Sequence, residues 1–243
     1  MPVSDSMISR VFAVLDAFTP SCRRLRLSDI AQSAGLTRPT TLRIIRQLET
    51  EGALVRHGMF YEVGERIWRL GLLASVQSDL RDRAAPFLHD LHAATRATVH
   101  LAVRKGDHAL YLDRIAGLAS VPVVSRVGET LPLHCTGVGK VLLAHAPKDV
   151  QARALAALHR KTAYTLTNRA VLISQLDEVR RRGFATTHEE MTLGACSVAV
   201  PVLAADATTV AALGIVVPRL GRDVGRFVTA MTVAARGIGR TIE

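Results

Sequence analysis

The sequence predicts an α+β protein in which a small, mostly helical N-terminal part precedes a larger part of mixed strands and helices. Apolar residues recur at helical spacing in the first fifty residues, with capping residues and glycine between the helical segments. From Thr98 onward, runs rich in valine, leucine and isoleucine follow one another with short breaks and then alternate with helical segments. This order favours a mostly antiparallel sheet. A chain of 243 residues, 49% of them hydrophobic, can bury a sizeable core.

The formal net charge is +10, and arginine supplies most of it, with 27 Arg against 4 Lys. Residues 1–64 hold 8 basic and 6 acidic residues and so contribute only +2, which leaves +8 for the remainder. A basic chain attracts polyanions non-specifically, so only local patterns can locate a nucleic-acid site. Three scattered cysteines, Cys22, Cys135 and Cys196, predict neither a disulfide framework nor a zinc site.

The first ten residues and the apolar stretch 198–217 predict a cytoplasmic protein without a membrane partner. The N-terminal MPVSDSMISR lacks the basic and apolar regions of a signal peptide. The apolar stretch 198–217 is interrupted by Pro201 and Asp206, which indicates two strands rather than a membrane helix.

Three helices are expected before residue 51. The first covers 4–18. Ser28 is a suitable N-cap for a second helix over 29–34, which Gly35 ends with a sharp turn. Thr37 is a suitable cap for the third helix, in whose first turn Pro39 is tolerated.

The third helix has an apolar face and a cationic face. Thr41, Ile44, Ile45 and Leu48 are spaced to point inward. The segments 54–57 and 60–63 then flank Gly58-Met59, which predicts a hairpin with a type II′ turn. A helix, a glycine turn, a basic helix and a hairpin form the pattern of a winged helix-turn-helix.

This pattern predicts binding to double-stranded operator DNA. Arginine can hold a phosphate or pair with guanine, and threonine can reach either a phosphate or a base edge. A solvated basic face is the alternative, which the turn, caps and hairpin disfavour. Leu42 could contact a thymine methyl group or pack against the wing. The candidate DNA-contacting residues are Ser28, Thr37, Arg38, Pro39, Thr40, Leu42, Arg43, Arg46, Gln47, Arg56 and His57.

A linker helix is expected over 65–83, with a continuation over 86–95. Its apolar stripe needs a partner, which could be a second subunit or another part of the same chain. The expected domains are therefore 1–64, the linker 65–83 and 84–243. In the last domain we expect strands at 98–103, 109–115, 121–127, 183–188, 196–203 and 209–218, and helices at 137–144, 147–158, 171–182 and 221–240.

No catalytic, metal or cofactor motif stands out in this domain, so we expect a sensing domain rather than an enzyme. GVGKV at 137–141 fails as a P-loop because His134 and Val141 occupy two of the motif positions. His89 and His92 share a helix face, but a solvated face explains them better than a metal site. His188 could line a pocket or end a strand, and Cys135 and Cys196 could be core residues or lie near a pocket.

Four blocks resemble the IclR family of bacterial transcriptional regulators along nearly the whole chain. They are LSDIAQSAGLTRPTTLRIIRQLETEGAL, the pair TVHLAV and ALYLDRI, then LPLHCTGVGKVLLAH, and finally GFATTHEEMTLGACSVAVPVL. The resemblance implies a homodimer or a dimer of dimers. It also implies a GAF-like C-terminal domain that binds a small metabolite, frequently an organic or aromatic acid, and so alters DNA binding.

Carried over by position, the resemblance places the effector site at Thr136, Gly137, Val138, Thr187, His188, Glu189, Ser197, Ala199, Gly214 and Val216. Gly137 would let a backbone N–H at a helix start face an anion. The chain departs from the family in having His188 where an aspartate is common, and Gly214 and Val216 where small hydroxyl residues often occur. We therefore expect a less polar pocket that favours an aromatic or longer acid over a very small oxoacid.

Two other functions are alternatives to a DNA-binding regulator. One is an enzyme or metabolite-binding protein that uses its winged helix for protein contacts, which predicts no sequence-preferring DNA complex. The other is RNA binding, which the 4% content of aromatic residues disfavours because no stacking platform is evident.

Overall fold

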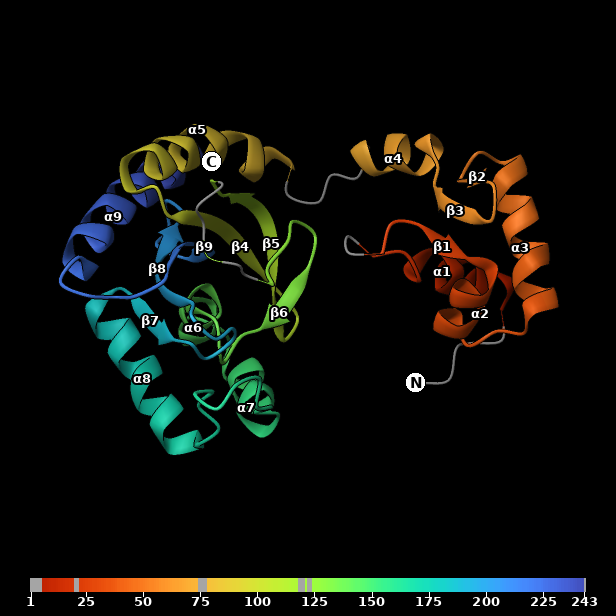
Figure 1. Cartoon of the computed structure of the whole chain (residues 1–243). Helices are drawn as coiled ribbons and strands as arrows, with labels where there is room; N and C mark the ends of the chain where they lie inside the picture. The colour runs from red at the N-terminus through yellow and green to blue at the C-terminus, as the bar shows by residue number, and fades with distance from the viewer. Residues whose placement is uncertain (1–5, 20–21, 74–77, 118–120, 122–123, 243) are drawn as a thin grey trace. The chain divides into compact units, whose positions relative to one another are not determined.

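The computed structural model describes residues 6–19, 22–73, 78–117, 121 and 124–242. These divide into two compact units, 1–76 and 77–243, which are described separately (Figure 1). The helices of the first unit are α1 (Met7–Asp16), α2 (Leu27–Ala34), α3 (Arg38–Thr50) and α4 (Glu65–Leu72), and its strands are β1 (Leu25–Arg26), β2 (Leu54–His57) and β3 (Phe60–Val63).

The first unit is a winged helix-turn-helix. Helices α1, α2 and α3 enclose a core that includes Val14, Ile30, Ile44 and Ile45. Gly35 ends α2 in the left-handed conformation, at φ +64°, which a residue without Cβ adopts at little cost. The strands form an antiparallel sheet in the order β1-β3-β2, as the wing prediction requires of β2 and β3.

One local prediction for this unit is wrong, and one short strand was not predicted. Ser28 is not the N-cap of α2, because the helix begins at Leu27 and Arg26 holds the capping position. The Asp29 carboxylate accepts the Arg26 backbone N–H at 3.1 Å, so an acid in the first turn performs the capping. The two-residue strand β1 was not expected within the basic stretch that precedes α2.

The second unit is a six-stranded antiparallel sheet between two helical layers. Its strand order is β6-β5-β4-β9-β8-β7. One face packs on α5 and α9 through residues such as Leu88, Leu101, Val200 and Ile238, and the other packs on α6, α7 and α8 (Figure 1). The helices are α5 (Ser78–Thr95), α6 (Gly137–Ala144), α7 (Lys148–Ala156), α8 (Arg169–Arg182) and α9 (Val224–Thr241). The strands are β4 (Thr98–Lys105), β5 (His108–Ile115), β6 (Thr130–Pro132), β7 (Ala185–His188), β8 (Cys196–Leu203) and β9 (Thr209–Val217).

The prediction of a strand at 121–127 is wrong for the residues that the structure describes there. These residues, 121 and 124–127, lie outside any strand. The edge strand is instead β6, which pairs with the start of β5. Gly128 adopts φ +84°, and its N–H reaches the Tyr111 carbonyl at 2.8 Å. The turn at Gly128 follows the valine-rich segment 121–127 in the sequence. The chain therefore joins the edge of the sheet only after that segment, as strand β6.

The linker differs from one continuous helix over 65–83. Helix α4 ends at Leu72, while α5 runs from Ser78 through the expected boundary at 83/84 with Pro86 inside it. Residues 74–77 of the expected helix lie outside the described residues. The expected domain boundaries therefore stay a prediction.

Candidate functional site

The outer face of α3 carries guanidinium groups with no partnering acid. Arg38, Arg43 and Arg46 are exposed, and no ion pair joins them to a carboxylate within the described residues. The predicted inner face is buried throughout. The helix begins as expected after Thr37, whose hydroxyl donates to Thr40 Oγ1 at 3.0 Å and accepts no backbone N–H. This face presents the positive charge that a phosphate backbone requires.

The remaining predicted DNA contacts lie on the same unit. Pro39 and Gln47 are exposed on α3, and Thr40 and Leu42 are half-buried. Ser28 is half-buried in the first turn of α2, with its hydroxyl directed to Asp29. Arg56 and His57 are exposed on β2, and Gly58 leads the turn at φ +63°. Arg56 Nε donates to the Gly58 carbonyl at 2.8 Å, so its guanidinium is held near the wing tip.

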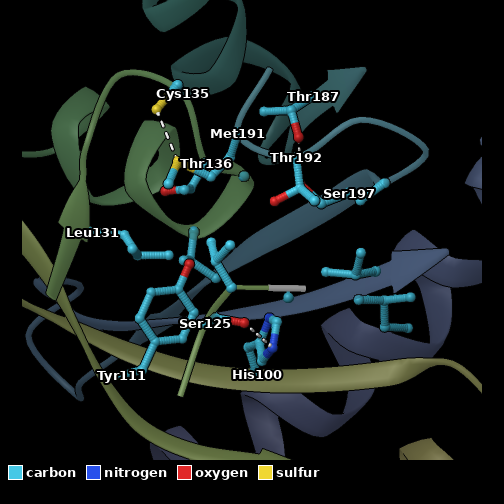
Figure 2. A pocket seen from close by; sticks show the side chains of 17 residues that line it. His100, Tyr111, Ser125, Leu131, Cys135, Thr136, Thr187, Met191, Thr192 and Ser197 are labelled. Carbon is cyan, nitrogen blue, oxygen red and sulfur yellow. Dashed lines mark hydrogen bonds between the residues drawn. The ribbon is translucent and has the colours of Figure 1, made fainter. Parts of the chain in front are cut away.

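The second unit holds a pocket between the sheet and the start of α6 (Figure 2). It contains about 470 Å³ of space between its atoms, mouth included. Strands β4 to β9 each contribute at least one lining residue, and the loop between β7 and β8 supplies another wall. The described side chains that line the pocket are all uncharged.

Seven of the ten predicted effector residues lie around this pocket: Thr136, Gly137, Val138, Thr187, Ser197, Gly214 and Val216. The other three do not line it. His188 is exposed at the end of β7, and Ala199 is fully buried beneath the pocket. Glu189 has φ +54° and accepts the Gly194 N–H at 2.7 Å, so its carboxylate stabilises the β7–β8 loop. The role of all ten in ligand binding stays a prediction.

Two glycines permit the close packing that forms this pocket. A Cβ on Gly137 would lie 2.5 Å from Ser197 Oγ, and a Cβ on Gly214 would lie 2.7 Å from Val138 Cγ1. Helix α6 therefore starts directly against β8 and β9. Thr136 caps the helix by accepting the Gly139 N–H at 3.1 Å. The first amides of a helix have no acceptor within it, and they carry partial positive charge.

Neutral polar groups face the pocket from two sides. On one side Ser125 Oγ and His100 Nε2 lie 2.8 Å apart, and on the other Thr187 Oγ1 and Ser197 Oγ lie 2.6 Å apart (Figure 2). Complete burial, assisted by the positive charge of Arg114, lowers the pKa of His100 to about 3. His100 is therefore neutral at physiological pH. Its ring meets Tyr111 edge-on with centroids 5.1 Å apart.

Cys135 and Tyr111 also remain neutral. Burial raises the pKa of the Cys135 thiol to about 12, and burial likewise raises the pKa of the Tyr111 phenol. Cys135 Sγ lies 3.6 Å from Met191 Sδ, so this thiol lines the pocket, whereas Cys196 is buried away from it. The pocket thus combines apolar and aromatic walls with hydrogen-bonding groups that carry no charge.

Several lining residues were not predicted from the sequence, including His100, Tyr111, Ser125, Leu131 and Met191. A histidine and a tyrosine within otherwise apolar strands were the available signal. They share the face of the sheet that packs on α6, whereas the neighbouring Leu101 and Leu112 pack on the opposite face. Ser125 gave no signal, because it belongs to an irregular segment.

The two histidines that share a face of α5 differ in their surroundings. His92 Nδ1 lies 2.7 Å from the Ala97 carbonyl, and His89 is exposed. No group of three potential metal ligands occurs in the part of the chain that the structure describes. Within that same part, no helix combines the length and hydropathy that a bilayer crossing requires.

Comparisons with known proteins match both units. Residues 7–58 match the IclR helix-turn-helix domain, and residues 73–240 match the family described as bacterial transcriptional regulator IclR C-terminal. A crystal structure of an IclR homolog from Microbacterium hydrocarbonoxydans, complexed with 4-hydroxybenzoate, superimposes with a TM-score of 0.90. It is 30% identical, and the match covers 98% of this chain and 99% of that one.

Characterised relatives are similar over most of their length. The HTH-type transcriptional regulator XynR of Escherichia coli is 30% identical over 220 residues, which cover 88% of this chain and 86% of XynR. The p-hydroxybenzoate hydroxylase transcriptional activator of Acinetobacter baylyi is 30% identical over 213 residues, covering 85% of this chain and 79% of that protein. These are regulators rather than enzymes. With its helix-turn-helix and its effector domain matched in order, this chain belongs to the IclR family of DNA-binding bacterial transcriptional regulators.

Proposed function

We propose that this regulator binds operator DNA as a homodimer or a dimer of dimers, and that an aromatic monocarboxylic acid in the second-unit pocket modulates its affinity or activity. The observation that carries the ligand class is the uncharged, partly aromatic pocket beside the start of α6. Apolar walls and the Tyr111 ring suit an aromatic body. A carboxylate suits the first amides of α6, which can bind an anion without a basic side chain.

The polar pair formed by His100 and Ser125 suits a hydroxyl group on the ring of the ligand. His100 and Ser125 form a neutral pair that can both donate and accept. An acid with a polar substituent can therefore satisfy hydrogen bonds on the His100 side as well as at α6. The similar protein whose structure contains 4-hydroxybenzoate supports this ligand class. A very small oxoacid would leave the apolar walls unfilled.

Dimerisation is supported by exposed apolar residues in the first unit. On α1, Ile8 is 70% exposed and Phe12 59%, and on α4, Trp68 is 62% exposed and Leu72 65%. Each pair is spaced i, i+4, so each forms a stripe on its helix. Large apolar side chains exposed in this way are typical of interaction surfaces. A second copy is the natural partner because helix-turn-helix proteins commonly bind paired half-sites.

The test is fluorescence anisotropy with duplex DNA from upstream of the protein's own gene at about 150 mM salt, with a scrambled duplex as competitor. 4-Hydroxybenzoate, benzoate, pyruvate and glyoxylate are then added separately. We expect preferential binding to the upstream duplex and a shift caused only by the aromatic acids. A shift caused by pyruvate or glyoxylate alone would overturn the ligand class but not DNA binding. Equal affinity for both duplexes in the absence and presence of every acid would contradict the operator assignment.

A further inference from the structure

A second cavity is lined by α9, by β8 and the residues that follow it, and by the end of α8. Figure 1 shows where these elements lie in the second unit. We call this cavity the α9 groove. It contains about 1340 Å³ of space between its atoms, mouth included. It shares no lining residue with the pocket beside the start of α6, which we call the effector pocket after the ligand proposed for it. Its apolar floor includes Val200 from β8 and Val228 and Ala235 from α9. A Cβ on Gly239 would meet the Leu203 carbonyl oxygen at 2.2 Å, so α9 approaches β8 closely at this end of the groove.

Among the residues that the structure describes, the charged side chains lining the groove are all arginines. Arg236 and Arg240 are one turn apart on α9, and both are exposed. Arg182 lines the groove from the end of α8. It is held in place, because its Nη1 lies 2.7 Å from Glu178 Oε1 and its guanidinium stacks 4.3 Å from the Phe184 ring centroid. No ion pair neutralises Arg236 or Arg240 within the described residues.

We propose that the α9 groove is a second ligand site that takes an amphipathic anion, a carboxylate or sulfonate on an extended aliphatic or aromatic body. The apolar floor would bury the body of such a molecule, which is the main source of its affinity. Arg236 and Arg240 pair the anionic head, since a guanidinium group can donate two parallel hydrogen bonds to two oxygens of one oxyanion. The effector pocket lacks basic side chains, so the two sites differ in chemistry.

The arginines of α9 also supply a matched control. Arg222 lies just before α9 and Arg226 lies in its first turn; both are exposed, and neither lines the groove. The double variants Arg236→Ser/Arg240→Ser and Arg222→Ser/Arg226→Ser remove the same charge from the same region. Binding of 8-anilinonaphthalene-1-sulfonate to the full chain is followed by its fluorescence. Any probe bound in the effector pocket contributes equally to both variants.

We expect the groove variant to bind the probe at least tenfold more weakly than the parent, and the control variant to match the parent within about twofold. Decanoate should displace the probe, and 1-decanol should not at the same concentration. Equal probe affinity in the groove variant and the parent would overturn the site. An equal loss in both variants would show only a diffuse charge effect and would also overturn it. Displacement by 1-decanol as readily as by decanoate would reject the anion as the recognised group.

Discussion

Lys140 Nζ lies 2.5 Å from Glu190 Oε1, and the two side chains are 1% and 6% exposed. The pair joins α6 to the β7–β8 loop from behind the effector pocket. Lys140 is three residues beyond Gly137, and Glu190 directly precedes Met191, so both partners neighbour pocket-lining residues. Gln175 Oε1 accepts a second hydrogen bond from Lys140 at 2.8 Å. The ion pair therefore fixes two walls of the pocket relative to each other.

Lys140→Met should destabilise the protein by about 3–5 kcal/mol, because it leaves the Glu190 carboxylate buried without its counter-charge. Burial already raises the pKa of Glu190 and lowers that of Lys140, which shows that desolvation weighs heavily on both groups. The measurement is the free energy of unfolding from urea denaturation at pH 7.

Two further variants make this prediction specific. Lys140→Met/Glu190→Gln should recover most of the loss, since neither charge remains buried alone. Lys148→Met, at an exposed position in the first turn of α7, should change the free energy by less than about 0.5 kcal/mol. A single Lys140→Met variant as stable as Lys148→Met would show that the ion pair does not support the fold.

His100 should make the protein less stable as the pH falls. Its pKa is about 3 in the folded state against 6.5 for the free side chain, so below pH 6.5 the unfolded chain binds a proton that the folded chain excludes. Well above pH 6.5, where neither state binds the proton, the residue contributes no pH dependence. Between pH 7.0 and 5.5 the parent should lose about 1 kcal/mol more than His100→Gln. Denaturation of both proteins at the two pH values measures this difference.

An exposed histidine provides the comparison for that experiment. His108 begins β5 and is exposed, so His108→Gln should keep the pH dependence of the parent. Parallel pH profiles for the parent and His100→Gln would contradict the assignment of a buried, neutral imidazole to this pocket wall.

Gly137→Ala should reduce stability by about 1–3 kcal/mol and weaken 4-hydroxybenzoate binding, because the new Cβ would lie 2.5 Å from Ser197 Oγ. Calorimetric titration and thermal unfolding measure the two effects. Adding Ser197→Ala removes the clashing oxygen and should restore part of the stability. Gly225→Ala, in α9, is the control, because a Cβ at that position meets no atom within 4 Å. This substitution should stabilise the helix slightly. If Gly137→Ala matched Gly225→Ala in stability, the close approach of α6 to β8 would be disproved.

The structure could be predicted from the sequence wherever a local pattern determines it. The inward face of α3, the capping position of Thr37 and the hairpin bounds follow from spacing and turn chemistry, and the structure confirms them. Local signals competed at Ser28, where the nearby Asp29 performs the capping instead. The edge strand β6 was missed because three residues carry no periodicity.

The effector pocket could be predicted only in part, because it joins segments that are far apart in the chain. Residues on the helix start and late strands were placed by family resemblance, whereas Ser125 meets His100 only through the tertiary fold. The burial of Lys140 was likewise invisible in a segment that resembles a P-loop ending, since its partner lies fifty residues later. Pairings of this kind depend on long-range packing rather than on local sequence.

Arg43→Ala should weaken binding to the specific operator by about 1–3 kcal/mol if its guanidinium pairs bidentately with a guanine, and should relax preference at that base. The residue is exposed in the middle of α3, and no carboxylate within the described residues neutralises it. Anisotropy titrations of the parent and the variant against operator and scrambled duplexes measure both quantities. Arg169→Ala, exposed at the start of α8 in the other unit, removes the same charge and should leave operator affinity unchanged. An equal loss of affinity for both duplexes would assign Arg43 to a phosphate instead, provided that the slope of log affinity against log salt concentration also becomes shallower by about one. Unchanged affinity for both duplexes would remove Arg43 from the interface.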